Sequence, residues 1–166
     1  MIIFTDASYS EQTKVAGLGF VIIDKKFDYK AGNFRINCQD NNVAELGAIA
    51  EALKFCQTSN LFKISSDRTV SIITDSKYAV GKINSPNPNA SEQEKEYIKI
   101  ITEILDKCPL KSTIFQIKGH TNGEDKFSYY NNIADTIAGD YRYLGEIEKE
   151  RNLTLMVTKK KKGKER

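Results

Sequence analysis

The sequence predicts a single α/β domain in which an antiparallel meander is followed by parallel strands. Three short apolar segments follow one another within the first 37 residues and are separated by polar turns, which is typical of hairpin-connected strands. A further apolar run at 70–74 lies between segments of helical periodicity, and such a strand–helix–strand succession favours parallel pairing through a right-handed crossover. The chain has 166 residues, of which 40% are hydrophobic and 28% charged, so it is long enough for one buried core.

The strands are predicted from short apolar runs that end in turns or polar residues. We expect them at residues 2–5, 16–24, 30–37, 70–74 and 114–117. The first and fourth runs are almost entirely apolar, as in strands that are buried on both faces. Each is followed directly by an aspartate, Asp6 after the first and Asp75 after the fourth.

The helices are predicted from apolar spacing and from capping residues. We expect them at residues 43–56, 76–83, 91–107 and from about 131 onward. Asn41 or Asn42 would cap the first helix, and Ser91 with Glu94 would form a capping box for the third. The polar stretch 119–130 is expected to be a long loop.

Four acidic residues stand at the ends of predicted elements or on helix faces near them: Asp6, Glu45, Asp75 and Asp135. Because the carboxyl ends of parallel strands meet at one edge of a sheet, these side chains could converge there. Carboxylates brought together repel one another, and Mg²⁺ or Mn²⁺ would neutralise them. Two such ions about 3.5–4 Å apart suit phosphodiester hydrolysis. Any one of these acids alone is better explained as a cap or a solvated group, so only the joint pattern indicates a metal-dependent nuclease or phosphotransferase.

The cysteines and the apolar segments indicate a cytoplasmic protein that does not enter a membrane. Cys38, Cys56 and Cys108 are odd in number and lack C-x-x-C spacing, so we expect reduced thiols and no zinc site. No apolar run approaches the roughly 18–20 residues of a membrane-spanning helix. The amino terminus has no signal-peptide pattern.

The net charge of +3 is concentrated at the carboxyl terminus. Residues 159–166 carry six positive charges and one negative charge, so the preceding 158 residues carry a net charge of −2. We therefore expect a catalytic domain at 1–150 and a flexible basic tail at 151–166. The tail lysines that could attract phosphates are Lys159, Lys160, Lys161, Lys162 and Lys164. A purely solubilising tail, or a nuclear import signal, would have the same composition.

Five short phrases together resemble type 1 ribonuclease H. They occur in the order found in that family, at Phe4–Ser8, Asn41–Leu53, Thr74–Tyr78, Lys118–His120 and Asn131–Ala138. The resemblance covers about residues 1–145. Each phrase alone is weak, but the five together are specific. The resemblance implies a ribonuclease H-like fold, with a five-stranded mixed sheet and helices on both faces.

The resemblance also implies an activity and a set of site residues. Asp6, Glu45, Asp75 and Asp135 would bind two Mg²⁺ ions, for which Mn²⁺ could substitute, and His120 would assist proton movement and product release. The enzyme would hydrolyse the RNA strand of RNA–DNA hybrids and leave 5′-phosphate and 3′-hydroxyl ends. The residues expected to contact the substrate are Ser8, Asn41, Asn42, Ser76 and Lys77.

The sequence departs from common bacterial members of the family in several places. The stretch between Asp75 and His120 lacks the Trp- and Lys-rich handle that grips the substrate, as in retroviral ribonuclease H domains. Asp40 replaces a threonine that serves the DNA-strand phosphate, and Ala7 replaces a glycine. The loop from His120 to Asp135 is also several residues longer than usual. Of these departures, Asp40 would repel the phosphate and so predicts a weaker grip on the DNA strand.

Three functions are compatible with this pattern. The first is a hybrid-specific endoribonuclease that acts as a monomer on RNA–DNA duplexes without a small-molecule cofactor. The second is another metal nuclease of the same fold, such as a junction resolvase or an exonuclease. The third is a weakly active or inactive ribonuclease H-like module that binds nucleic acid. The presence of all four acids favours an enzyme over a binding module.

Overall fold

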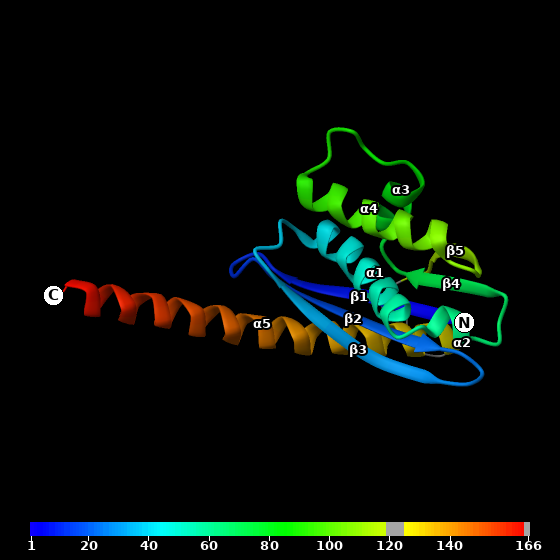
Figure 1. The fold of residues 1–166 in the computed structure, drawn as a ribbon, viewed down its shortest axis with the longest axis horizontal. Coiled ribbons are helices and arrows are strands. Elements are labelled where there is room, and N and C mark those ends of the chain that lie inside the picture. Colours follow the sequence, from blue (N-terminus) through cyan, green and yellow to red (C-terminus); the bar gives the residue numbers. More distant parts are fainter. Residues whose placement is uncertain (119–124, 165–166) are drawn as a thin grey trace.

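The computed structural model describes the backbone of residues 1–118 and 125–164, and the side chains of residues 1–118 and 125–153 (Figure 1). The strands are β1 (Ile2–Ser10), β2 (Val15–Ile23), β3 (Asp28–Ile36), β4 (Thr69–Thr74) and β5 (Lys111–Gln116). The helices are α1 (Asn41–Thr58), α2 (Leu61–Ile64), α3 (Lys77–Asn84), α4 (Glu92–Lys107) and α5 (Lys126–Lys164).

The five strands form one mixed sheet in the order β3-β2-β1-β4-β5. The pairs β1–β2 and β2–β3 are antiparallel, whereas β4 pairs in parallel with both β1 and β5. This arrangement confirms the predicted fold class. The central place of β1 puts its side chains between the antiparallel half and the parallel half of the sheet.

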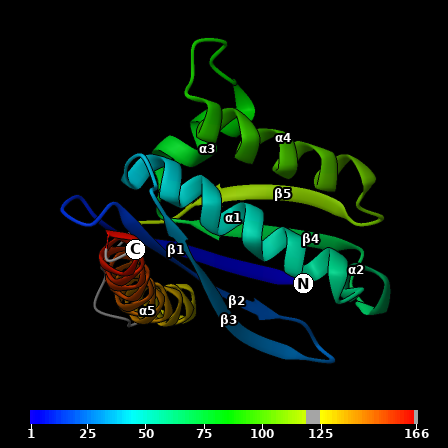
Figure 2. The same cartoon turned by 60° about the vertical axis from the view of Figure 1, so that its left-hand side comes forward.

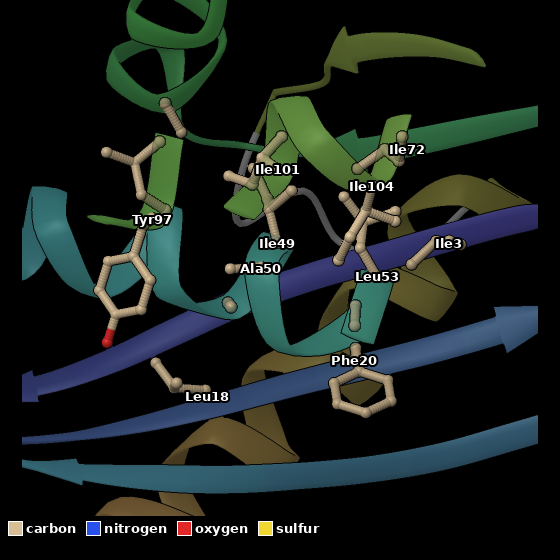
Figure 3. Close-up of a cluster of buried hydrophobic side chains, with 14 of the residues drawn as sticks. Ile3, Leu18, Phe20, Ile49, Ala50, Leu53, Ile72, Tyr97, Ile101 and Ile104 are labelled. Carbon is tan, nitrogen blue, oxygen red and sulfur yellow. The ribbon is translucent and has the colours of Figure 1, made fainter. Parts of the chain in front are cut away.

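Helices cover both faces of the sheet, and alternating side chains fill the two cores. Helix α1 packs on one face and α5 on the other, as Figures 1 and 2 show from two directions. In β1, Ile3 belongs to the core under α1, whereas the next residue, Phe4, belongs to the core under α5. Ile72 and Ile73 in β4 divide in the same way. Figure 3 shows the larger core, where residues of α1 and α4 meet those of β1, β2 and β4.

Helix α5 lies unusually close to β2 because β2 has glycines where the two meet. A Cβ atom on Gly17 would lie 1.8 Å from the carbonyl oxygen of Ala138, and one on Gly19 would lie 2.1 Å from that of Ala134. Any side chain at these two positions would therefore push the helix backbone away. This approach matters for the site, because Asp135 follows Ala134 and Gly19 lies opposite Asp6 in the β1–β2 register.

Some predicted element boundaries are wrong, and one short helix was not predicted. Strand β1 runs to Ser10 rather than to residue 5, because its second half pairs with β2 through Val15, so Asp6 lies within the strand. The cap of α1 is Asp40 rather than Asn41 or Asn42, since the Asp40 carboxylate accepts a hydrogen bond from the Val43 amide at 2.9 Å. The short helix α2 was not predicted at all.

The last helix also begins earlier than predicted, at Lys126 rather than near residue 131. Asp125 provides the reason, because its carboxylate accepts hydrogen bonds from the amides of Phe127 at 2.8 Å and Ser128 at 3.0 Å. At its other end α5 continues without a break past residue 150. The domain division at that residue and the flexibility of the tail stay predictions.

Two expectations about the chain as a whole can be compared with the structure. The three cysteines are free, with Cys38 and Cys56 buried and Cys108 half-buried. Among the described residues, no helix combines the length and the apolar composition needed to cross a bilayer.

Candidate metal centre and nucleic-acid surface

Three of the four predicted acids form a cluster. One carboxylate oxygen each from Asp6, Glu45 and Asp75 can be chosen so that all three lie within 4.8 Å of one another. Asp6 and Glu45 are each only 5% exposed, whereas Asp75 is half-buried. The cluster therefore opens to solvent on the side of Asp75.

The sheet register explains why Asp6 and Asp75 meet. The parallel pairing of β1 with β4 matches Phe4 to Ile73, and the same offset continued by two residues places Asp6 level with Asp75. Strand β4 ends at Thr74, so Asp75 stands at the carboxyl edge, as predicted. Glu45 comes from the first turns of α1, the helix that packs directly on β1.

Asp135 lines the same cavity but stands outside the cluster of the other three acids. It lines, together with Asp6, Glu45 and Asp75, an open cavity of about 510 Å³. The metal-ligand cluster of the described residues includes the first three acids and not Asp135. The close packing of α5 on Gly19 is what brings this helix residue to the edge of the cavity.

Burial and mutual repulsion raise the pKa values of the two most buried acids. Desolvation, followed by the charge of Asp75, raises the pKa of Asp6 to about 7, although the Ala7 amide, which donates to its carboxylate at 2.8 Å, opposes the shift. Desolvation, followed by the charge of Asp6, raises the pKa of Glu45 well above its usual value. The protein alone therefore does not stabilise these carboxylates in their ionised form.

The donor set fits a hard divalent cation. Oxygen ligands from carboxylates suit Mg²⁺ and Mn²⁺, whereas zinc sites use cysteine or histidine much more often. The Oε2 atom of Glu45 is buried and has no hydrogen-bond partner among the described residues. A buried acceptor without a partner is costly, and a cation beside Asp6 and Asp75 would satisfy it. Asp6, Glu45 and Asp75 are the residues that would hold such an ion, with Asp135 beside them.

The predicted substrate contacts line the same cavity as the acids. They are Ser8 from β1, Asn41 and Asn42 from the start of α1, and Ser76 and Lys77 from the start of α3. The side chains of Asn41, Asn42 and Lys77 are exposed there. Ser76 also caps α3, because its hydroxyl accepts a hydrogen bond from the Ala79 amide at 3.1 Å. The arrangement offers amides, hydroxyls and one ammonium group around a carboxylate cluster.

Sequence reasoning missed two tyrosines at this cavity. Tyr9 and Tyr78 line it, and both directly follow or end a phrase by which the family was recognised. Asp40, by contrast, does not line it; its carboxylate is engaged in capping α1. A threonine could cap the helix too, so capping alone does not require an aspartate. The negative charge of Asp40 still lies at the start of α1.

Two groups of predicted site residues cannot be placed. His120 lies in the segment 119–124, outside the described residues. The side chains of Lys159, Lys160, Lys161, Lys162 and Lys164 lie outside them as well.

A family comparison agrees with this geometry. The model of the RNase H family matches residues 1–142. The chain belongs to the RNase H family. It is thus a ribonuclease H enzyme, and its family is metal-dependent. No curated protein matches the sequence significantly.

Several solved structures share the fold. RNase H1 from the halophilic archaeon Halobacterium salinarum NRC-1 has a TM-score of 0.63 and 15% identity, over 84% of this chain and 95% of that one. LC11-RNase H1, crystallised with an RNA/DNA hybrid, has a TM-score of 0.62 and 22% identity, over 84% and 96%. The prototype foamy virus protease–reverse transcriptase has a TM-score of 0.65 and 25% identity, over 86% of this chain and 20% of that much longer one.

Proposed function

We propose that this ribonuclease H hydrolyses the RNA strand of RNA–DNA hybrids with two divalent metal ions and leaves 5′-phosphate and 3′-hydroxyl ends. The observation that carries the proposal is the convergence of Asp6, Glu45 and Asp75 within 4.8 Å at the cavity that Asp135 also lines. When bound, the two ions would supply an activated water and would offset charge on the leaving oxygen. In this hydrolysis the water oxygen bonds to phosphorus, the bond to the 3′ oxygen breaks, and that oxygen takes up a proton.

The residues of the chain have separate tasks in this proposal. Asp6, Glu45 and Asp75 would hold the ions. Because burial raises the pKa of Asp6 and of Glu45, neutralisation by the ions would favour the ionised forms of these two carboxylates. Asp135 completes the ligand set from the α5 side. His120 assists proton movement and product release, as the family resemblance implies.

Substrate selection follows from the shape and the hydroxyl groups of the hybrid. An RNA–DNA hybrid has a wide minor groove with 2′-hydroxyls on one strand only. Asn41, Asn42, Ser8 and Ser76 offer hydrogen-bonding groups to that strand, and Lys77 offers a charge to its backbone. The lysines of 159–164 add attraction that the acidic body lacks.

The finer assignments are part of the same proposal. Mg²⁺ is the expected ion because it suits carboxylate oxygens and accompanies phosphate substrates. We also propose that the enzyme acts as a monomer without a small-molecule cofactor. A cytoplasmic location is proposed because the three cysteines are free thiols.

An assay on a panel of duplexes tests the proposal against its alternative. One end-labelled RNA strand is offered annealed to DNA, annealed to RNA, and alone, each with Mg²⁺ and with EDTA. The proposal predicts internal cuts in the hybrid only, and only with Mg²⁺. Binding of the hybrid without cleavage would instead support a catalytically weak binding module, and cleavage of duplex RNA would refute selection through the DNA strand.

A further inference from the structure

The first turn of α4 contacts the cavity wall through a buried carboxylate. Ser91 caps α4 as predicted, since its hydroxyl accepts a hydrogen bond from the Glu94 amide at 3.2 Å. In a full capping box the Glu94 side chain would bond back to the start of the helix. Instead, its Oε2 atom accepts a hydrogen bond from the Tyr78 hydroxyl at 2.8 Å, and its Oε1 atom has no partner among the described residues. A carboxylate that is only 5% exposed is thus committed to a residue lining the cavity.

The neighbouring residue, Gln93, holds the other wall of the cavity. Its Oε1 atom accepts a hydrogen bond from the Gln39 amide at 2.9 Å, and its Nε2 atom donates one to the Asn37 carbonyl at 2.9 Å. Both ends of one side-chain amide therefore bind the backbone of the loop 37–40. Asp40, which ends this loop, caps α1, and the next two residues line the cavity.

The loop 37–40 is anchored at two of its residues, because Cys38 is buried in the core and Asp40 caps α1. Asn37 and Gln39 are exposed, and Asn37 has a left-handed backbone with φ of 60°. Besides Gln93, the Tyr9 hydroxyl donates to the Gln39 carbonyl at 3.0 Å, and Lys149 contacts the side chain of Asn37 at 3.4 Å. The Cys38 amide between these two residues donates to the Lys14 carbonyl at 2.8 Å. Exposed residues with few bonds move easily, so the two bonds from Gln93, one to Asn37 and one to Gln39, are a substantial part of what fixes these two residues.

We propose that Gln93 and Glu94 are positioning residues that hold the two walls of the cavity at the separation a hybrid duplex requires. Gln93 acts through the start of α1, with Asn41 and Asn42, and Glu94 acts through Tyr78 on α3. The inference rests on the proposed function, because it assumes that these walls bind the substrate. Groups held in advance bind without an ordering cost, and small displacements of such groups are expensive.

Kinetics of Gln93→Ala test the proposal. The variant should raise KM for a hybrid by about fivefold to tenfold, as expected when a segment loses two hydrogen bonds. Its kcat should stay within about twofold of wild type, because Asp6 lies on β1, Asp75 directly follows β4, and Glu45 is on the buried face of α1 that packs on β1. Glu92→Gln is the matched control on the same turn, since Glu92 is exposed and its side chain bonds to Lys95 at 3.1 Å and to no other described residue, and it should leave both parameters unchanged.

Glu94 offers a conservative variant as a second test. In Glu94→Gln the amide oxygen can still accept from Tyr78, so KM should stay close to that of wild type. In Glu94→Ala, KM should rise as in Gln93→Ala. Equal KM values for the two Glu94 variants would overturn the proposal. A lower kcat, a higher KM and a lower melting temperature together in Gln93→Ala would show a general structural role and would overturn it too.

A triple substitution tests whether Gln93 acts through Asn41 and Asn42. In a background of Asn41→Ala with Asn42→Ala, adding Gln93→Ala should not raise KM further; an undiminished increase would overturn the proposal. The same comparisons are made for the dissociation constant of a fluorescent hybrid in EDTA. If the wild type binds the hybrid but does not cut it, the proposed function fails, while the dissociation constants of the variants still test the positioning role. If it neither binds nor cuts, both proposals fail.

Discussion

Replacing Asp6 by asparagine should stabilise the protein when no metal is present. The carboxyl group of Asp6 is only 5% exposed, and burial together with the charge of Asp75 raises its pKa from the ordinary 3.8 to about 7. Each tenfold change in acidity corresponds to 1.36 kcal/mol, so the ionised form costs the fold about 4 kcal/mol above pH 7. Asparagine removes that charge, and its side-chain oxygen can still accept from the Ala7 amide.

The stability gain of Asp6→Asn over wild type should grow as the pH rises. Between pH 3.8 and about 7 the folded protein holds a proton on Asp6 that the unfolded chain has lost, so the unfolding free energy of wild type falls as the pH rises. We expect Asp6→Asn to be more stable than wild type by about 2 to 4 kcal/mol at pH 8, since a buried amide has some desolvation cost of its own. At pH 5 the advantage should fall below about 2 kcal/mol.

Urea denaturation followed by circular dichroism, in EDTA at pH 5 and pH 8, measures both differences. Asp140→Asn is the matched control, because Asp140 is an exposed aspartate on α5 and its substitution should change stability by less than about 0.5 kcal/mol. Added Mg²⁺ should stabilise wild type and not Asp6→Asn. If Asp6→Asn is no more stable than wild type at pH 8, or gains equally at both pH values, the electrostatic reasoning is refuted.

Four further predictions concern Asp75, Gly19, the pH dependence of Mg²⁺ binding and the carboxyl-terminal lysines. Asp75→Asn should lower kcat below about a tenth of wild type, since a lost ligand costs several kcal/mol of transition-state stabilisation, and a more active variant would remove Asp75 from the site. Gly19→Ala should destabilise the fold by at least about 3 kcal/mol in urea denaturation, because its Cβ would lie 2.1 Å from a backbone oxygen of α5, whereas Gly139→Ala, with nothing within 4 Å, should not destabilise it. Binding of Mg²⁺ measured by calorimetry should tighten and release fewer protons as the pH rises through about 7, the pKa of Asp6, and an affinity independent of pH would contradict this. Deleting 159–166 should raise KM at moderate salt with little change in kcat, and a KM unchanged by the deletion at both low and moderate salt would argue against a tail that attracts phosphates.

The sequence predicted those features that depend on local pattern. Apolar runs predicted the five strands, with the end of β1 as the largest error, and the acids at strand ends and on the first long helix predicted Asp6, Glu45 and Asp75 as neighbours. The parallel pairing of β1 with β4 was the one long-range step needed, and the alternation of strands with helices implied it.

Other features depend on contacts between distant parts of the chain, which no local pattern contains. The length of β1 was underestimated because the polar residues after Asp6 are held by pairing with β2 rather than by burial. The role of Gly19 requires knowing that α5 crosses it. The bonds of Gln93 to the loop 37–40 join residues more than 50 positions apart, and the sequence had instead predicted that Glu94 would serve its own helix.

The central claim is that the carboxylate cluster cuts RNA in hybrids with the help of divalent ions. The most direct measurement is a single-turnover reaction in which the enzyme and an RNA–DNA hybrid are mixed in EDTA and cleavage is started by excess Mg²⁺, with the ends of the products then identified. The account predicts no cleavage before Mg²⁺, and afterwards internal cuts in the RNA strand alone, with 5′-phosphate and 3′-hydroxyl ends. Cleavage that begins in EDTA, cuts in the DNA strand, or products with 3′-phosphate ends would contradict it.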